Sequence, residues 1–260
     1  NTAYVCFNHR RYGDFKPYLL KTTDGGKNWK SLAATLPERG SVYSIAEDHV
    51  DRNLLFCGTE FGVFFSPDGG ENWVQLKSGL PTVAVRDIEI QRRENDLVLA
   101  TFGRGFYILD DYSPLRGLGK ETFEKDAQLF AVKDAWMFIP SLPLGLRDKG
   151  HMGSSYYAAD NPAVGAVFTW WLKEDIKTLK KQRQEAEKAK ADKKEVVYYP
   201  DIEALRKEDE QPEPYILFTI TDASGDVVRH IKTSATKGLK RLVWDFRYNN
   251  PAPVVGRFTP

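Results

Sequence analysis

The chain has 260 residues, of which 42% are hydrophobic, 13% aromatic and 28% charged. Its 37 basic and 36 acidic residues leave a formal net charge of +1, so it lacks the basic excess typical of nucleic-acid-binding proteins. No apolar run approaches the roughly 20 residues that a membrane-spanning helix needs, and aromatic residues in short alternating segments favour sheets over helices.

Two similar nine-residue segments mark an internal repeat. Residues 21–29 read KTTDGGKNW, and residues 65–73 read FSPDGGENW. Their aspartates, Asp24 and Asp68, are 44 residues apart, which is close to the length of a four-stranded β-propeller blade. The period therefore predicts successive four-stranded sheets.

Short alternating segments predict the strands of these sheets. Residues 3–8 form a strand that already takes the second place in its unit. The next two units are expected to contain strands at residues 42–47, 53–59, 62–66 and 72–76, and at 85–91, 96–101 and 105–110. Asp110 and Asp111 stand where a third Asp-Gly-Gly segment is due, without its glycines and tryptophan. Because a propeller does not close on about two and a half blades, we expect a fragment of a longer protein, or one that associates with the missing part.

The second half of the chain is predicted to start a different β unit. Residues 127–139 are expected to form a strand pair or an edge segment, and residues 140–161 an irregular connector rich in Pro, Gly, Ser and Tyr. Strands are then expected at residues 163–172, 215–222, 227–233 and 239–246. The predicted domains are residues 1–119, a connector at 120–162, and residues 163–260 with an insertion at 173–212.

The insertion is predicted to be helical. Residues 174–195 contain neither Gly nor Pro and are dense in Lys, Glu, Gln and Ala, which favour helix. Their apolar stripe is thin, as in a solvated arm; an arm that binds a partner is the alternative. Asp201 is expected to cap a second short helix that runs to Lys207.

The remaining residues of chemical interest are the cysteines, histidines and clustered tryptophans. Cys6 and Cys57 hold equivalent places in successive units and are expected to be small buried thiols. The four histidines are scattered without metal-ligand spacing, so no metal and no cofactor are expected. Trp170, Trp171 and Trp244 are expected to fill a core or to form a sugar-stacking platform, and strand alternation puts Trp170 and Trp171 on opposite faces.

The repeated turn resembles a known motif. Its pattern, Ser/Thr-x-Asp-x-Gly-x-x-Trp, is similar to the Asp-box, or bacterial neuraminidase repeat, of sialidases, sortilin-type propellers and two-propeller xyloglucanases. A narrower resemblance covers most of residues 1–172 and 214–250. It is to large bacterial secreted proteins, described as sortilin-like or glycosyl-hydrolase-like, that end in an immunoglobulin-like module. The segments that carry it are residues 58–73, 79–81, 96–98, 103–105, 108–111 and 238–246.

This resemblance implies an all-β fold: a partial β-propeller of Asp-box blades followed by an immunoglobulin-like β-sandwich with a helical insertion. The propeller is expected to be incomplete at its N-terminal side and the second module at its C-terminal side. A secreted or cell-envelope location is also implied.

The Asp-box residues are expected to be structural. Paired glycines permit a tight turn with positive φ, the aspartate accepts hydrogen bonds from turn amides, and each tryptophan packs under its turn for about 2–3 kcal/mol. Catalytic or calcium-binding aspartates are the alternative, but the motif recurs with the blade, whereas a catalytic group is needed once. The residues concerned are Thr22, Asp24, Gly26, Trp29, Ser66, Asp68, Gly70 and Trp73.

Ligand contacts are expected at the opposite end of the sheets. In the propellers that the chain resembles, the ligand side consists of loops between second and third strands and loops between blades. Residues 9–16 form a long loop of this kind, in which arginines could clamp a carboxylate or sugar hydroxyls; a solvated polar loop is the alternative. The candidate ligand-binding residues are His9, Arg10, Arg11, Tyr12, Asp14, Glu38, Arg39, Glu60 and Arg104.

The expected function is recognition of a glycan or protein ligand, with the remainder of the same polypeptide's propeller as a second partner. The alternative is that the chain is part of a glycoside hydrolase, sialidase- or xyloglucanase-like, whose catalytic carboxylates need the missing blades. No sialidase-like Arg-Ile-Pro segment is present, and no catalytic residue can be assigned. Catalysis by the fragment alone is not expected.

Overall fold

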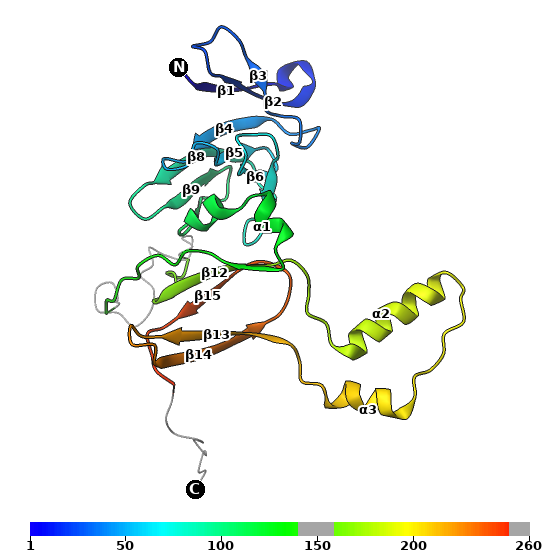
Figure 1. Ribbon diagram of the computed structural model, residues 1–260. Helices are drawn as coiled ribbons and strands as arrows, with labels where there is room; N and C mark the ends of the chain where they lie inside the picture. Colours follow the sequence, from blue (N-terminus) through cyan, green and yellow to red (C-terminus); the bar gives the residue numbers. More distant parts are fainter. Residues whose placement is uncertain (140–158, 250–260) are drawn as a thin grey trace. The chain divides into compact units, whose positions relative to one another are not determined.

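The computed structural model describes residues 1–139 and 159–249 (Figure 1). The secondary-structure elements of these residues are mostly strands, with few helices, so the described chain is all-β in class. The strands form several small antiparallel sheets, and none of the described sheets closes into a ring. The chain divides into two compact units, at residues 1–123 and from residue 124 onward. The predicted connector at residues 140–161 lies, up to residue 158, outside the described residues.

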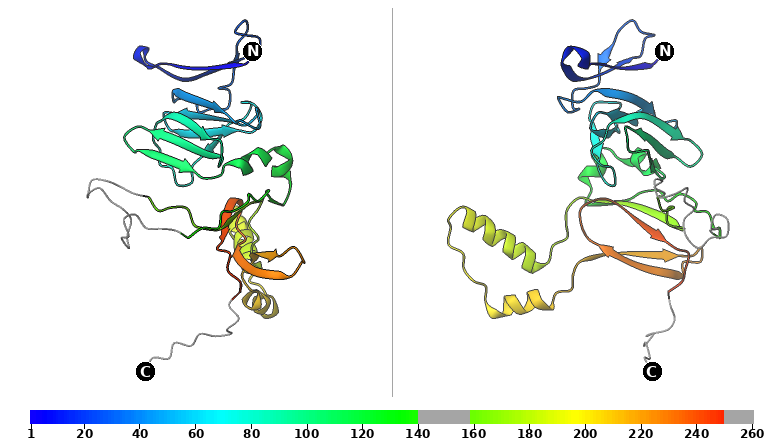
Figure 2. Two further views of the ribbon diagram at one scale, coloured as in Figure 1. Left: turned by 90° about the vertical axis from the view of Figure 1, so that its left-hand side faces the viewer. Right: turned by 180° about the vertical axis from the view of Figure 1, so that it is seen from behind.

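The first unit contains three sheets that follow one another along the chain (Figures 1 and 2). The first consists of β1 (Ala3–His9), β2 (Asp14–Thr22) and β3 (Lys30–Ser31). The second is a four-stranded meander of β4 (Val42–Glu47), β5 (Leu55–Thr59), β6 (Gly62–Ser66) and β7 (Val74–Leu76). The third consists of β8 (Val85–Gln91), β9 (Asp96–Thr101) and β10 (Phe106–Leu109). The strands expected from the 44-residue period are therefore present, close to their predicted bounds.

The second sheet is the centre of the first unit. All residues of β5 and β6 are buried, and β4 contacts both β1 and β8. A core cluster joins the first two sheets: Leu19, Leu32, Leu36, Val42, Leu55, Cys57, Phe64 and Trp73. Gly58 permits the close approach of β8, because a Cβ there would lie 2.6 Å from the Val85 carbonyl oxygen. Cys57 is fully buried and Cys6 packs against the same cluster; both thiols are free.

The outer faces of the first and third sheets carry exposed apolar side chains. Val5 and Phe7 of β1 are 42% and 40% exposed, on the face opposite the residues that pack on the core. Phe106 and Ile108 of β10 are 75% and 59% exposed, whereas Leu97 and Leu99 of β9 point to the buried side. Each end of this set of sheets thus presents an uncovered apolar face.

Three short helical elements complete the first unit and its end. A 3₁₀ turn, η1 (Arg10–Tyr12), joins β1 to β2, and a second one, η2 (Ser113–Gly117), follows β10 where a fourth strand would otherwise begin. Helix α1 (Lys120–Glu124) comes directly after it.

The second unit contains a three-stranded sheet and a hairpin. Strands β11 (Ala127–Leu129), β12 (Ala166–Leu172) and β15 (Gly238–Trp244) form the sheet, and β13 (Tyr215–Thr221) pairs with β14 (Val227–Ser234). Residues 127–139 were predicted to form a strand pair or an edge segment; only β11 is a strand there, and it lies at the edge of its sheet. Phe168 and Trp170 contact Phe218 of the hairpin at ring distances of 5.7 and 6.1 Å, which joins the two sheets.

The three tryptophans of this unit do not share a face. Trp170 is 4% exposed and packs toward the hairpin, so it belongs to the core. The strand register puts Trp244 on the same side as Trp170 and puts Trp171 on the other. The prediction that all three residues form one sugar-stacking platform is therefore wrong.

The insertion contains α2 (Leu179–Asp192) and α3 (Ile202–Glu210), which project away from the β13–β14 hairpin (Figure 1). Helix α2 is shorter than predicted because Thr178 caps it, accepting a hydrogen bond from Lys181 N. The predicted cap of the second helix is confirmed, since Ala204 N donates to Asp201 Oδ1 at 2.7 Å. Helix α2 buries no residue, and the two helices are joined by the Arg183 guanidinium.

Candidate functional site

The two repeated turns, at residues 21–29 and 65–73, contain a dense set of hydrogen bonds; we call them the Asp-box turns after the motif that they resemble. In the first turn, the amide of Gly26 donates to Thr22 Oγ1 at 3.0 Å, and the Thr22 hydroxyl donates to Asp24 Oδ1 at 2.8 Å. The same Asp24 oxygen accepts from the amides of Lys27 and Asn28 at 2.9 and 3.0 Å. The other oxygen accepts from Asn28 Nδ2 at 2.7 Å. Both carboxylate oxygens are therefore occupied by their own turn.

The second turn repeats this pattern with a serine in place of the threonine. Gly70 N donates to Ser66 Oγ at 2.8 Å, and the Ser66 hydroxyl donates to Asp68 Oδ1 at 2.7 Å. The amides of Glu71 and Asn72 and the side chain of Asn72 complete the set at 3.1, 2.9 and 2.7 Å.

These hydrogen bonds fix the charge of both aspartates. Bonds from the backbone and side chain of Asn28, and then from Thr22, lower the pKa of Asp24 to about 2. Burial by itself would raise the pKa of Asp68, but bonds from Asn72 and Ser66 outweigh burial, so this pKa is also lowered. A carboxyl that stays ionised at neutral pH has no proton to donate, which disfavours a general-acid role for either residue.

The tryptophans of the two turns differ in their surroundings. Trp73 is 7% exposed, belongs to the core cluster, and donates from Nε1 to the Leu32 carbonyl of the preceding repeat at 2.7 Å. Trp29 is 43% exposed and donates only to Gly26 within its own turn, at 3.1 Å. The Trp29 ring lies against its own turn, as expected, but the expectation that it is buried is wrong.

All nine predicted ligand-binding residues lie on what we call the loop face, defined as residues 9–16, 38–41, 60–61 and 102–104. Its parts are joined by backbone hydrogen bonds: Gly40 N to the Phe15 carbonyl at 2.8 Å, and Glu60 N to the Ser41 carbonyl at 3.0 Å. Phe102 N makes the corresponding bond to the Ala84 carbonyl at 2.9 Å in the third sheet. The antiparallel register puts these loops at the end of the sheets opposite the Asp-box turns.

The first of these loops is more compact than expected. His9 pairs with Asp14 across the hairpin, so only η1 and Gly13 lie between the strands. Gly13 has a φ of +77°, a left-handed conformation that a glycine adopts without strain. The predicted long loop at residues 9–16 is therefore a short 3₁₀ turn that presents its side chains outward, with Tyr12 84% exposed.

Three of the predicted residues, Asp14, Glu38 and Arg39, line one pocket of about 750 Å³. The Arg39 guanidinium lies 5.3 Å from the centre of the Phe15 ring, which is also part of the pocket. The other six predicted residues do not line this pocket, although their loops are on the same face: His9, Arg10, Arg11, Tyr12, Glu60 and Arg104.

Asp14 is hydrogen-bonded to a tyrosine. The Tyr18 hydroxyl donates to Asp14 Oδ2 at 2.5 Å, and Lys16 N donates to Oδ1 at 3.1 Å. The bond from Tyr18, with that from Lys16, lowers the pKa of Asp14, and the same bond raises the pKa of Tyr18. The pair is thus a hydrogen-bonded phenol and an ionised carboxylate at neutral pH, which provides an acceptor for a ligand and no general acid.

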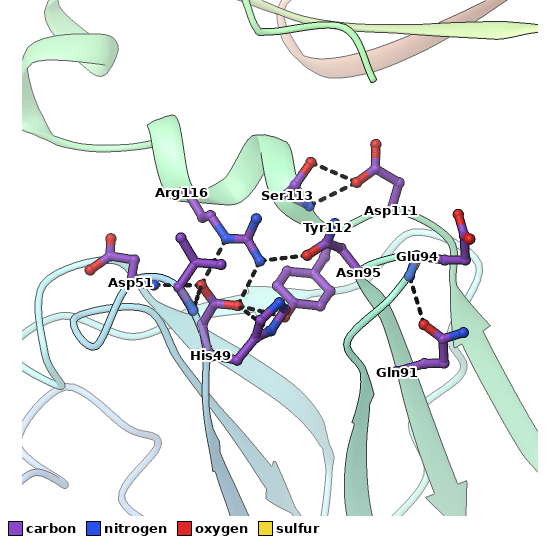
Figure 3. Close-up of polar contacts among 11 residues, drawn as sticks. His49, Asp51, Gln91, Glu94, Asn95, Asp111, Tyr112, Ser113 and Arg116 are labelled. Atoms are coloured by element: carbon purple, nitrogen blue, oxygen red, sulfur yellow. Dashed lines mark hydrogen bonds and ion pairs between the residues drawn. The ribbon is translucent and has the colours of Figure 1, made fainter. Parts of the chain in front are cut away.

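A second polar network, at the Asp-box end of the unit, was not predicted from the sequence. Asp48, in the turn after β4, is 2% exposed. Its partners Arg116 and Tyr112 are labelled in Figure 3. Arg116 of η2 donates to it from Nε at 2.7 Å and from Nη2 at 2.9 Å, and the Tyr112 hydroxyl donates at 2.5 Å. The amides of Val50 and Asp51 also donate to it, at 3.2 and 2.8 Å.

This network joins the second sheet to the third. Arg116 Nη2 also donates to Asn95 Oδ1 at 2.7 Å, in the β8–β9 turn, and the Tyr112 ring contacts Phe56 of β5 edge-on at 5.0 Å. Burial alone would raise the pKa of Asp48, but the bonds from Arg116 and Tyr112 outweigh it, so the pKa is lowered. The spacing of Asp48 and Asp51 predicts a turn. The partners Tyr112 and Arg116 are more than 60 residues away from Asp48, so the local sequence could not predict them. With its acceptors filled and its side chain enclosed, Asp48 has the surroundings of a structural anchor.

No protein-family model matches the chain, and no curated protein matches it. The resemblance to Asp-box proteins therefore remains a prediction. Within the described part of the chain, no helix is long and apolar enough to cross a membrane. The same residues hold no group of three or more His, Cys, Asp or Glu side chains placed to hold a metal ion.

Proposed function

We propose that the chain carries blades of an Asp-box β-propeller and an immunoglobulin-like module, and that its loop face binds a glycan or protein ligand. The observation that supports this most is the repetition of one hydrogen-bonded turn at equivalent positions of two successive sheets. In a propeller, a structural turn is expected to recur at one end of every sheet. The loops at the opposite end of the sheets are expected to differ in their side chains and to bind the ligand.

The exposed apolar faces support a further part of this proposal. Trp73 is buried against the preceding repeat, whereas Trp29 in the equivalent turn is 43% exposed. Val5 and Phe7 at one end, and Phe106 and Ile108 at the other, are apolar side chains of the kind that an adjacent blade covers. We propose that sheets of the same design, from the remainder of the same polypeptide's propeller, pack on both faces.

Binding is favoured over hydrolysis by the chemistry of the pocket. The pKa of Asp14 is lowered, so its carboxyl group holds no proton to donate at neutral pH, and the pKa of its partner Tyr18 is raised, which disfavours an activated phenolate nucleophile. Recognition of a ligand needs a hydrogen-bond donor and apolar ring faces. Arg39 provides the donor, and the exposed rings of Phe15 and Tyr12 provide the faces. The second candidate remains a glycoside hydrolase whose paired carboxylates include groups from other blades. A secreted or cell-envelope location is proposed from the resemblance alone.

A carbohydrate-array screen of the 260-residue chain, with a hydrolysis assay on every glycan that binds, tests this function. We expect binding without product release. Arg39→Gln should weaken binding by roughly tenfold, since hydrogen bonds to charged groups contribute about 1.5–3 kcal/mol. Arg93→Gln, an exposed residue of the β8–β9 turn at the opposite end of the sheet, is the matched control.

Two outcomes would contradict the proposal. Product release that is abolished by Asp14→Ala or Glu60→Ala would replace the binding role with hydrolysis. Glycan and peptide arrays that both stay empty, with a folded chain, would remove the loop face as a ligand site.

A further inference from the structure

Two successive sheets of the first unit have a β-bulge at the same place. In the second sheet, Val42 pairs with Thr59 and Ser44 with Gly58, so Tyr43 is an extra residue in β4. In the third sheet, Val85 pairs with Thr101 and Asp87 with Ala100, so Arg86 is the extra residue in β8. A bulge turns its side chain out of the regular alternation, and bulges are over-represented next to binding and catalytic sites.

The bulges bring their two side chains together. The Arg86 guanidinium carbon lies 4.0 Å from the centre of the Tyr43 ring and 5.2 Å from that of Phe102, on the adjacent loop. On the other side, Arg10 Nη1 of η1 lies 3.5 Å from the Tyr43 hydroxyl. Side chains from all three sheets therefore meet at the loop face, and we call Arg10, Tyr43, Arg86 and Phe102 the bulge cluster.

The bulge cluster carries two cations without an acidic partner. Among the described residues, no carboxylate oxygen lies within 4.0 Å of the guanidinium nitrogens of Arg10 or Arg86. Arg86 is half-buried, and its enclosed Nε has no hydrogen-bond partner in this part of the chain. Stacking on an aromatic ring occupies the face of a guanidinium and leaves its edge for a planar anion, which a carboxylate matches in bidentate fashion.

We propose that the bulge cluster binds the carboxylate of an acidic sugar, with Arg86 as the main contact and Arg10 as the second cation. The proposal rests on the ligand-binding role of the loop face and specifies its ligand class. The aromatic residues beside the two cations favour a sugar over a bare anion. Phe102 is 69% exposed, and Tyr12, two residues after Arg10, is 84% exposed, so both offer ring faces to the C–H face of a pyranose.

Titration of the full chain with glucuronate, glucose and acetate, followed by NMR of labelled protein, tests this proposal. Glucuronate should bind with shifts at the amides of residues 43 and 86, and glucose and acetate should bind at least about tenfold more weakly. Arg86→Gln should weaken glucuronate binding by about 10- to 100-fold, which is the fold-change for hydrogen bonds to a charged group. Arg86→Lys should restore little of it, because lysine keeps the charge but lacks the planar fork.

Two further variants, both at exposed positions, distinguish a loss of glucuronate binding from a loss of folding. Arg10→Gln removes an exposed side chain whose loss leaves the sheet packing intact, and it should weaken glucuronate binding by severalfold while the amide spectrum stays native. Arg92→Gln removes an exposed arginine in the β8–β9 turn and should have no effect.

Several outcomes would overturn the proposal. These are equal affinity for glucose and glucuronate, equal affinity for acetate and glucuronate, or unchanged glucuronate binding in both Arg10→Gln and Arg86→Gln. Selective binding of neutral glycans on the array would overturn this inference and leave the proposed binding function standing, so the two failures are distinguishable.

Discussion

Removing the carboxylate of Asp48 should destabilise the first unit more than any other single loss of charge there. This carboxylate accepts five hydrogen bonds, from two backbone amides, the Tyr112 hydroxyl and two nitrogens of Arg116. Its side chain is fully enclosed, and that of Arg116 is 20% exposed. Asp48→Asn keeps the shape but leaves the Arg116 guanidinium without its anion.

The magnitude follows from the cost of an uncompensated buried charge. Breaking a buried ion pair by removing one partner costs about 3–5 kcal/mol, and the partial exposure of Arg116 favours the lower end. We therefore expect Asp48→Asn to lower the free energy of unfolding by about 3 kcal/mol. Tyr112→Phe removes one hydrogen bond to a charged group and should cost about 2 kcal/mol. The double variant Asp48→Asn/Arg116→Gln should cost less than the sum of the two single variants, because the second change removes the orphaned cation.

The same network predicts a dependence on pH. The pKa of Asp48 is lowered in the folded state, whereas an aspartate in the unfolded chain has a pKa of about 3.9. The stabilisation is therefore fully present above about pH 5 and is lost as the pH falls below about 4, toward the folded pKa. Asp48→Asn should be less sensitive than the native chain over this range.

Amide hydrogen exchange of β4 and β8 peptides, combined with urea unfolding, measures these changes in the first unit alone. Asp87→Asn, at an exposed position of β8, is the control and should change the free energy by less than about 0.5 kcal/mol. If Asp48→Asn behaves like this control, or if the double variant costs the full sum, the assignment of Asp48 as an anchor is wrong.

Two other substitutions test single structural features. Gly70 has a φ of +97°, and a Cβ there would lie 2.7 Å from a buried leucine, so Gly70→Ala should cost about 2–3 kcal/mol in urea unfolding. Gly79→Ala, with a φ of +74° but open space, should cost less, and equal losses would contradict the steric argument. In the insertion, Glu208 receives two bonds from Arg183 at 2.8 and 2.9 Å, so Glu208→Gln should reduce helicity by circular dichroism. Asp209→Asn, 74% exposed, should not, and equal helicity in both variants would refute the role of this pair.

The β class and most of the strands could be predicted because their signals are local. Alternating segments and the 44-residue period predicted the strands of the first unit, since side chains of a strand alternate between its faces. The hairpin of the second unit and the Asp201 cap were predicted for the same reason: turn and capping bonds join residues a few positions apart. The exposure of Trp29 was not predicted, because the ring of its counterpart, Trp73, is covered by a residue 41 positions earlier in the chain.

The candidate site was only partly predictable. Loop positions follow from strand order, so the residues of the loop face could be named. Only Asp14, Glu38 and Arg39 of the nine predicted residues line the pocket. This could not be predicted, because it depends on the packing of loops that are separate in the sequence. The bulge cluster had a faint signal, since the pattern Val-x-x-Ile begins at both residue 42 and residue 85. A bulge, however, is defined by its pairing with another strand, which a single segment does not contain.

The sequence by itself determined the period of the sheets, the repeated turns, and the role of Asp24 and Asp68 as acceptors of hydrogen bonds from their own turns. These properties arise within nine residues and need no distant partner. Only the tertiary structure decided that Arg86 stacks on Tyr43 and that Arg116 neutralises Asp48. Each of these contacts joins residues more than 40 positions apart, so its energy depends on packing that no local pattern contains.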